Sequence, residues 1–383
     1  MLSSPWQKIQ GNKYLRKDGL AHFVCCYILC TILGNYARQG IESLTTYTPS
    51  YITPTTVLWA NCGACVIMGI LQDLKEPVFN AGGYQTLFLS LTTGFCGSFS
   101  SFSTMMLEIF TYSTSLTSGD IKLKLHLPNR AYGMMEFLSV LITHLGISMT
   151  SLLFGRQLAR DVMVPYIVME TTDVSNASSS NIDTENSDED NSAEKNGSFE
   201  EPVKFIRPWC EKVLFVMDIS LTVMSIPIMA MIIVLAGYYE NYSRARWTLP
   251  CLFGIPGSFL RYYLALWFNN KKYINNYPLG TYIANCFASL MLAVFILIQR
   301  GQKNSFTHLR IIENVNTCHV VGALANGFCG SLSTISTFIN EVYGKNIIFT
   351  LKYYFSTIFT AYCLYVIILG SYAWSKGLTE PVC

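Results

Sequence analysis

The sequence contains few charged residues. Asp, Glu, Lys and Arg make up 13% of its 383 residues, whereas 51% are hydrophobic. A soluble globular domain has about 25% charged residues, so this chain has too little charge to cover a soluble surface. The charges also gather in an N-terminal patch, a central acidic stretch and short turns, which leaves long apolar runs between them. This composition excludes a soluble fold and indicates membrane-spanning helices.

Other signals are absent as well. The net charge is only +2 and the basic residues do not gather on one face of any segment, which argues against a nucleic-acid partner. No nucleophile-base pair, phosphate-binding loop or paired catalytic carboxylates occur, so nothing supports an enzyme or an ATP-driven pump. The 13 cysteines lie mostly in apolar segments, without the loop spacing of a secreted disulfide framework. We expect reduced thiols.

The apolar runs predict nine membrane-spanning helices when they are measured with a window of about 20 residues. The expected spans are residues 20–41, 54–74, 85–110, 133–157, 212–238, 247–268, 278–299, 317–343 and 347–375. Between the fourth and fifth spans, residues 171–201 are rich in Ser, Asn, Asp and Glu and nearly free of apolar residues. Such a segment cannot bury enough surface to offset its ordering entropy, so we expect a disordered linker.

Three landmarks recur in the same order in the two halves. Arg38 is followed by Asn61 after 23 residues, and Arg261 is followed by Asn285 after 24. Each pair precedes a segment that begins Gly-Phe-Cys-Gly-Ser, at residues 94–108 and 327–341, and these two segments match at nine of 15 positions. The sequence is therefore an internal repeat.

The two copies are expected to face opposite ways in the bilayer. Arg38 and Arg261 fall in the first and sixth spans, an odd number of crossings apart, so the fifth span inverts the second copy. With the N-terminus inside, 15 Lys or Arg lie on the cytoplasmic side and 9 outside, which favours a cytoplasmic N-terminus and an extracellular C-terminus. The sequon at Asn241 would then face outside, whereas glycosylation of Asn176 or Asn196 would contradict this topology.

These patterns predict an all-α polytopic membrane protein of two inverted four-helix repeats joined by one inverting transmembrane helix. The expected parts are an N-terminal cytoplasmic tail at 1–19, a first repeat at 20–160, a disordered acidic linker at 161–211, the inverting helix at 212–238 and a second repeat at 247–383.

The third and eighth spans combine glycine with many hydroxyl side chains. Small and hydroxylated residues at this density weaken a helix and compete for its backbone groups, so we expect a break in each span. Two inverted breaks that meet at a pseudo-twofold axis could hold a cation with freed carbonyls. The alternative is a small-residue packing interface between helices.

The segments at 94–108 and 327–341, each preceded by an Arg and an Asn, resemble the Fluc (CrcB) fluoride channels and their fused two-domain eukaryotic exporters. The resemblance covers nearly the whole chain outside the tail and linker. It implies a pseudo-dimer in one chain with two antiparallel candidate pores and a central structural Na⁺. By position, the Na⁺ ligands would be the carbonyl oxygens of Gly97, Ser100, Gly330 and Ser333.

In the family, a Phe-Ser-Thr-Phe motif supplies two ring positions per copy, and each pore takes one ring from each copy. Here the first copy has Phe102 and Met105, and the second has Ile335 and Phe338. Pairing across copies gives one pore with both rings and one with neither. We therefore expect one conducting pore and one vestigial pore, because ring edges offer a dehydrating anion positive partial charge that Met and Ile do not.

The resemblance assigns further residues to the path. Asn61 and Asn285 would offer amide donors in the pores, or else form interhelical hydrogen bonds. Arg38 and Arg261 would raise the anion concentration in the vestibules or extend to the headgroups, and Glu108 and Glu341 would lie near the pore mouths or pair with a cation. Hydroxyl groups would line the path as further donors, from Ser103, Thr104, Ser336, Thr337, Tyr353 and Thr357.

Together, these expectations predict that a single chain exports fluoride passively across the plasma membrane, which would confer fluoride resistance. A negative cell interior favours anion exit by about 2.3 kcal/mol per 100 mV, so an open selective pore needs no coupling ion. The alternatives are a proton-coupled antiporter, which would share the inverted repeats, and a membrane scaffold that does not transport. The partners expected are the fluoride ion and the lipid bilayer.

Overall fold

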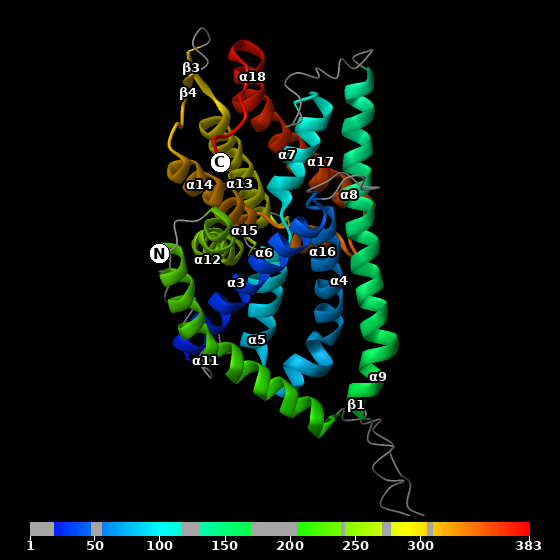
Figure 1. Ribbon diagram of the computed structural model, residues 1–383. Helices are drawn as coiled ribbons and strands as arrows, with labels where there is room; N and C mark the ends of the chain where they lie inside the picture. The colour runs from blue at the N-terminus through cyan, green and yellow to red at the C-terminus, as the bar shows by residue number, and fades with distance from the viewer. Residues whose placement is uncertain are drawn as a thin grey trace, which may run out of the picture.

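The computed structural model describes residues 19–46, 56–116, 131–169, 205–238, 242–269, 277–304 and 309–383. These residues form a bundle of tilted helices with two short hairpins of β-strand (Figure 1). The predicted N-terminal tail, the glycosylation sites at Asn176, Asn196 and Asn241, and the acidic stretch at 171–201 lie outside the described residues.

The first half of the bundle starts with the continuous helix α3. The third predicted span of this half is interrupted. The helices are α3 (Leu20–Leu44), α4 (Leu58–Leu74), α5 (Gln85–Leu89), α6 (Gly97–Phe99), α7 (Phe102–Ser113), α8 (Ala131–Leu158) and α9 (Val164–Ile167), with π-helical turns η1 (Lys75–Asn80), η2 (Ser90–Cys96) and η3 (Ala159–Met163). The helix α4 packs along α8, and α3 packs against η2 and α6.

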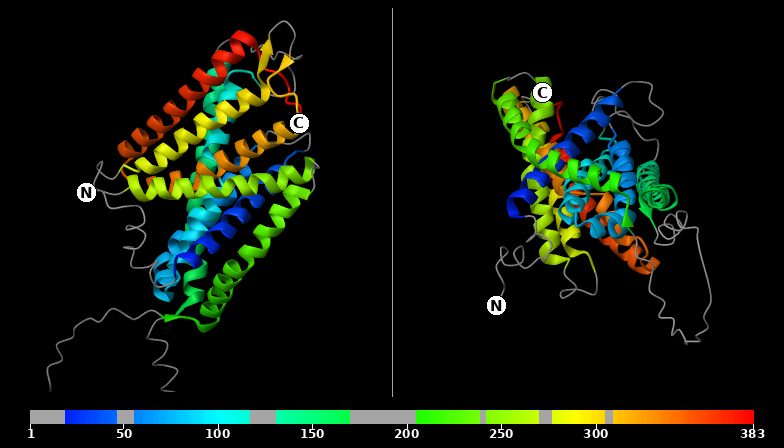
Figure 2. Two further views of the ribbon diagram at one scale, coloured as in Figure 1. Left: turned by 90° about the vertical axis from the view of Figure 1, so that its left-hand side faces the viewer. Right: turned by 90° about the horizontal axis from the view of Figure 1, so that it is seen from below.

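The second half repeats this order after one long helix. That helix, α11 (Pro208–Tyr238), packs against α3 and α12 (Figure 2). Most of its apolar side chains are exposed. The helices that follow are α12 (Tyr242–Phe268), α13 (Leu279–Arg300), α14 (Val315–Ala323), α15 (Gly330–Leu332), α16 (Ser336–Val342), α17 (Ile347–Tyr365) and α18 (Ser371–Lys376), with π-helical turns η5 (Leu324–Cys329) and η6 (Val366–Gly370).

The strands form two antiparallel hairpins. Strand β1 (Val168–Met169) pairs with β2 (Phe205–Ile206), and β3 (Gln302–Asn304) pairs with β4 (Leu309–Arg310). The first strand pair links the end of the first repeat to the start of α11, and residues 161–169, 205–206 and 208–211 are helix or strand. Both ends of the linker predicted at 161–211 therefore contain helix or strand, where Ile167 and Ile206 bring apolar side chains that the acidic stretch lacks. The predicted disorder of the acidic stretch stays a prediction.

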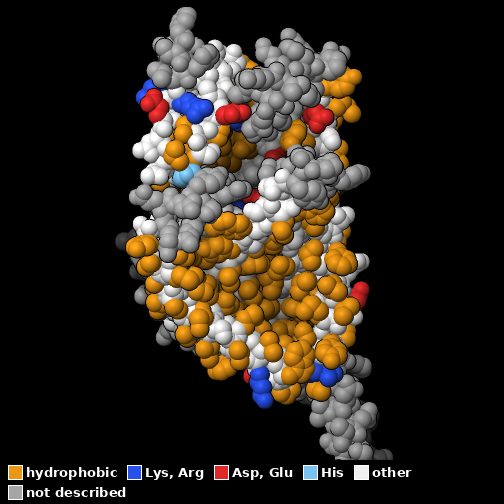
Figure 3. All heavy atoms as spheres, in the orientation of Figure 1, with side chains coloured by type: hydrophobic (Ala, Val, Ile, Leu, Met, Phe, Trp, Pro, Cys, Tyr) orange, Lys and Arg blue, Asp and Glu red, His pale blue; other side chains and the backbone are white. Residues whose placement is uncertain are grey.

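Each of the nine segments predicted as a span is helical to within a few residues. In the described part of the chain, six stretches are long and apolar enough to cross a membrane: Leu20–Leu44, Ala131–Ile167, Pro208–Tyr238, Leu279–Arg300, Val315–Val342 and Ile347–Lys376. Apolar side chains cover most of the face in Figure 3, and charged side chains gather near its two ends. The chain is thus a membrane protein, whereas the nine crossings and the inversion of the second copy stay predictions.

Both expected helix breaks are present. The first separates α6 from α7, where Ser100 is extended with ψ 153°. The second separates α15 from α16, where Ser333 is extended with ψ 155°. Three-residue helical turns precede both breaks, so the two copies are interrupted at matching positions. Contacts between α15 and both α6 and α7 bring the breaks together in the core.

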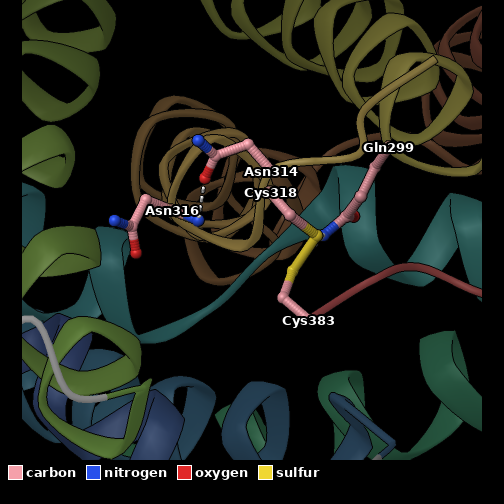
Figure 4. The surroundings of a disulfide bond; sticks show 5 residues. All are labelled: Gln299, Asn314, Asn316, Cys318 and Cys383. Atoms are coloured by element: carbon pink, nitrogen blue, oxygen red, sulfur yellow. Dashed lines mark hydrogen bonds between the residues drawn. A yellow bond between two sulfur atoms is a disulfide. The ribbon is translucent and has the colours of Figure 1, made fainter.

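One cysteine pair differs from the expected reduced thiols. Cys318, in the first turn of α14, forms a disulfide with Cys383, the last residue of the sequence, whereas the other 11 cysteines are free. Figure 4 shows the tail reaching the start of α14 beside Gln299 of α13. The Cα atoms lie 5.9 Å apart, within the range that a disulfide spans. The expectation was wrong here because pairing across 65 residues depends on the fold and not on local spacing.

Candidate ion pathway between the two repeats

Asparagine side chains from the second predicted span of each repeat hold the two breaks. The Asn61 Oδ1 atom accepts from the Ser101 backbone N–H at 2.8 Å, and its Nδ2 donates to the Ser101 carbonyl at 3.4 Å. Asn285 makes the same pair of contacts with Thr334, at 2.9 and 3.3 Å. A carboxamide can do this because it carries the same donor and acceptor as a peptide group. Both asparagines are fully buried.

These contacts free the carbonyl groups before each break. In a continuous helix the Ser101 N–H would donate to Gly97 and the Thr334 N–H to Gly330, four residues back. Both N–H groups donate to asparagine instead. The Gly97 and Gly330 carbonyls therefore need other partners, since a buried carbonyl without one is costly.

Hydroxyl groups cap each resumed helix from the opposite repeat. The Ser333 Oγ accepts from the Ser103 N–H at 3.0 Å in the first turn of α7. The Ser100 Oγ accepts from the Ser336 N–H at 3.2 Å in the first turn of α16. These serines thus satisfy N-terminal N–H groups of both helices from across the interface, which explains the high density of small hydroxylated residues there.

The side chains of the two copies also exchange hydroxyl contacts. The oxygens of Ser103 and Ser333 lie 2.9 Å apart, and those of Ser100 and Ser336 lie 3.1 Å apart. Thr104 lies 2.9 Å from Ser101, and all of these side chains except Thr104 are fully buried. The predicted hydroxyl residues at the breaks are therefore brought together, although most contact each other.

Both arginines lie in this interface and are nearly inaccessible, with Arg38 exposed by 2% and Arg261 by 3%. The Arg261 Nη1 donates to the Gly97 carbonyl at 2.6 Å and to the Ser333 carbonyl at 3.3 Å. The Arg38 Nη1 donates to the Ser98 carbonyl at 2.8 Å. The structure places both guanidinium groups inside the protein, and their predicted vestibule role stays a prediction.

The donor chemistry at the predicted cation site fits Na⁺. Backbone oxygens are the ligands that hard cations prefer. Two of the four predicted ligands, the Gly97 and Ser333 oxygens, come from different repeats and converge on one cationic group. The carbonyl oxygens at this site thus face positive charge, part of which the Arg261 guanidinium already supplies.

Phe102 and Phe338 come from different repeats and touch. Their ring centroids lie 5.2 Å apart at 61°, and both side chains are fully buried. The Phe338 ring also contacts the Tyr353 ring at 4.8 Å and stacks on Tyr354 at 4.9 Å. Met105 and Ile335 are equally buried but place no ring at the corresponding positions.

The two glutamates have different surroundings. Glu341 accepts from the hydroxyl groups of Thr281 at 2.5 Å and Tyr353 at 2.8 Å, and from Asn269 at 3.3 Å. Its network therefore adjoins the Phe102–Phe338 pair through Tyr353.

Glu108 instead accepts from the Thr56 hydroxyl group at 2.8 Å and the Val57 N–H at 2.7 Å, and it lies 3.1 Å from His144. Two other predicted residues make local hydrogen bonds: Thr357 donates to the Tyr353 carbonyl, and Thr337 contacts Thr334.

Comparison with known proteins follows this geometry. The family described as CrcB-like protein, Camphor Resistance (CrcB), matches twice, at residues 25–151 and 248–371. The chain belongs to this family. The matches cover both broken spans, so the two copies found in the sequence are two CrcB domains.

Three fungal relatives of this CrcB protein extend over nearly its whole length. It is 47% identical to fluoride export protein 2 and 46% identical to fluoride export protein 1 of Saccharomyces cerevisiae, over 97% of this chain and 99% of each relative. It is 33% identical to fluoride export protein 1 of Candida albicans, over 91% of this chain and 79% of the relative. No solved structure matches the chain.

Several residues of this CrcB protein's candidate site were missed in the sequence. Asn35 and Ser258 each stand three residues before an arginine and contact its guanidinium, at 2.8 and 3.3 Å. Aligning the repeats on Arg38 and Arg261 would have found this pair. His144 was missed as well, although it matches the predicted Tyr353 in role, because each contacts the glutamate of its own repeat. Unequal loop lengths hide that match, and Asn269 has no signal at all.

Proposed function

We propose that this chain is a fluoride-selective channel that lets F⁻ leave the cell passively and so confers fluoride resistance. The names of its full-length fungal relatives support fluoride export. The observation that carries the channel mechanism is the contact between Phe102 and Phe338 at the crossing of the two broken spans.

Fluoride must exchange its water for other positive partial charge. An aromatic ring provides it at its edge, and hydroxyl and amide groups provide hydrogen-bond donors. Along this path the Phe102 and Phe338 rings are followed by the hydroxyl group of Tyr353 and the Thr281–Glu341 network. Each asparagine Nδ2 has two hydrogens and directs one to the break carbonyl, so the other can meet an anion.

Only one of the two candidate pores is proposed to conduct. Met105 and Ile335 occupy the ring positions of the second pore and are fully buried, so that constriction is dry without an aromatic edge. An unpaired anion there would pay its full desolvation cost. The second pore is therefore vestigial.

The proposed Na⁺ would be held by the carbonyl oxygens of Gly97, Ser100, Gly330 and Ser333. When bound it would supply positive charge that offsets the freed carbonyl dipoles between the repeats. The protein itself prepares this place, because Asn61 and Asn285 divert the N–H groups that would otherwise occupy Gly97 and Gly330.

The protein is proposed to work as a single chain in the plasma membrane, with its N-terminus inside and its C-terminus outside. The disulfide between Cys318 and Cys383 supports this orientation, because disulfides persist on the oxidising side of a membrane. The outward anion gradient and the membrane potential drive export, so no catalytic step or coupled ion is required.

Fluoride efflux from liposomes that contain the purified protein tests the proposal. We expect selective fluoride efflux over chloride, at a rate unaffected by a proton gradient, and its loss in Phe338→Ile. Fluoride currents whose reversal potential depends on the proton gradient as well as on the fluoride gradient would show an antiporter. Absence of efflux from correctly inserted wild-type protein would favour a scaffold.

A further inference from the structure

The two buried arginines are exchanged between the repeats. Arg38 lies on α3 of the first repeat and donates through Nη2 to the Asn326 carbonyl of the second, at 2.5 Å. Arg261 lies on α12 of the second repeat and donates through Nη2 to the Thr93 carbonyl of the first, also at 2.5 Å. Thr93 and Asn326 hold the same position in their repeats, one residue before the Gly-Phe-Cys segment. The exchange is therefore reciprocal.

The acceptors of both guanidinium groups are backbone carbonyls and uncharged side chains. Arg261 contacts the Thr93, Gly97 and Ser333 carbonyls and the Ser258 hydroxyl group. Moving a charged group out of water is costly unless its hydrogen bonds are satisfied, and a planar guanidinium offers five donors for this purpose. Such a group suits a place where several carbonyl oxygens have lost their helical donors.

Glycine gives the guanidinium groups their space. A Cβ atom at Gly97 would collide with the Arg261 guanidinium, and its distance to Nη1 would be 2.8 Å. A Cβ atom at Gly330 would lie 2.5 Å from the Arg38 Nη1 and Nη2. Each arginine thus depends on one glycine of the opposite repeat, and this dependence is a second observation independent of the hydrogen bonds.

We propose that Arg38 and Arg261 are positioning residues that lock each repeat's broken span to the other repeat. The Arg261 guanidinium replaces the helical donor that the Gly97 carbonyl lost at the opposite break. The Arg38 guanidinium joins the Ser98 carbonyl at its own break to the Asn326 carbonyl of the other repeat, and together these contacts hold the Phe102 and Phe338 rings in register. The effect on fluoride passage rests on the proposed channel function, but the lock itself does not. A cation that only attracted anions into a vestibule would need neither the fork of Arg nor a particular glycine.

A double-mutant cycle on the full chain separates these roles. The variants are Arg261→Gln, Gly97→Ala and Gly330→Ala, singly and in the two combinations with Arg261→Gln, and the readout is the apparent melting temperature of the purified protein. We expect Arg261→Gln to lower it by at least about 5 °C. Adding Gly97→Ala to Arg261→Gln should lower the melting temperature much less than Gly97→Ala does in the wild type, because both substitutions break the same contact.

The combination of Arg261→Gln with Gly330→Ala is the matched control. Gly330 faces Arg38 and not Arg261, so the two losses of melting temperature should be additive. Arg300→Gln controls for losing an arginine, because Arg300 donates to the Thr379 carbonyl in the C-terminal tail. Equal additivity for Gly97 and Gly330 would overturn the reciprocal lock. If Arg261→Gln cannot be purified, the same cycle with Arg261→Lys decides the question.

Charge and geometry are distinguished by Arg261→Lys and Arg38→Lys. Lysine keeps the charge but lacks the planar fork, so we expect each variant to lose melting temperature and fluoride efflux as the Gln variant does. Full efflux in both Lys variants, with loss of efflux in Arg261→Gln, would show vestibule cations instead. Wild-type protein without efflux would contradict the channel, while the melting-temperature cycle would still test the lock.

Discussion

The ring of Phe102 meets the ring of Phe338 edge-on, with centroids 5.2 Å apart and planes inclined by 61°. The two residues are separated by 236 positions and come from different CrcB domains. The contact therefore exists only when the two broken spans are packed together, and it gives the proposed pore one ring from each domain.

Replacing either ring should stop fluoride passage. We expect Phe102→Ile and Phe338→Ile each to reduce liposome efflux at least about tenfold, a change of about 1.4 kcal/mol in the barrier. The aliphatic side chain keeps the site apolar but removes the positive ring edge. Met105→Ala and Ile335→Val are the controls and should retain efflux within about twofold. The reverse pattern would assign conduction to the other pore.

The hydroxyl group of Tyr353 should matter more than that of Tyr354. Both rings contact Phe338, but Tyr353 donates to Glu341, whereas the Tyr354 hydroxyl group has no partner among the described residues. We expect Tyr353→Phe to lower stability by about 1 kcal/mol and to slow fluoride efflux. Tyr354→Phe should change neither. Equal effects of the two substitutions on efflux would exclude the Glu341 network from the path.

Asn61 and Asn285 should contribute strongly to stability, since each satisfies the backbone N–H and the backbone carbonyl of one buried residue. We expect Asn61→Ala and Asn285→Ala each to destabilise the protein by about 1–3 kcal/mol. Thermal unfolding in detergent measures this, with Asn80→Ala as the control because Asn80 bonds Glu76 at an exposed site. Unchanged melting of the buried variants would mean that the breaks do not need these amides.

Sodium should stabilise the purified protein if the four break carbonyls bind it. We expect a lower apparent melting temperature when Na⁺ is replaced by choline at equal ionic strength, because choline is too large for the site. Potassium should give an intermediate value if the site discriminates by size. Identical melting in all three salts would leave the positive charge at the breaks to the arginines alone.

The disulfide should be present in protein taken from cells. Under denaturing, non-reducing conditions we expect 11 cysteines to react with a maleimide, and all 13 after reduction. On intact cells, a membrane-impermeant reductant followed by an impermeant maleimide should label Cys318 and Cys383, and the double variant Cys318→Ser, Cys383→Ser should remove the signal. Labelling only after permeabilisation would place this end of the chain inside.

Much of this architecture can be predicted from the sequence because the repeat and the apolar runs are local signals. The runs located the nine helical segments, and the glycine and serine pattern located both breaks. The repeat also paired Arg38 with Arg261 and Asn61 with Asn285. What a repeat shows is which residues have equivalent roles.

A repeat does not show which copy a side chain contacts. Ser333 caps α7 and Ser100 caps α16, and both arginines cross in the same way. These partners depend on how two helices cross in space, for which sequence spacing carries no information. The disulfide and the Asn269 contact were also missed. Each joins residues of the second repeat that only the fold brings together.

The reciprocal arginine contacts also affect how the two domains can diverge. A side chain at Gly97 would collide with Arg261 of the other repeat, and one at Gly330 would collide with Arg38, so neither repeat can change its break alone. At the ring positions the two copies differ, with Phe102 and Met105 in the first and Ile335 and Phe338 in the second. Under the proposed function, fusion into one chain allows one pore to lose its rings, while the arginine contacts keep both halves of the junction dependent on each other.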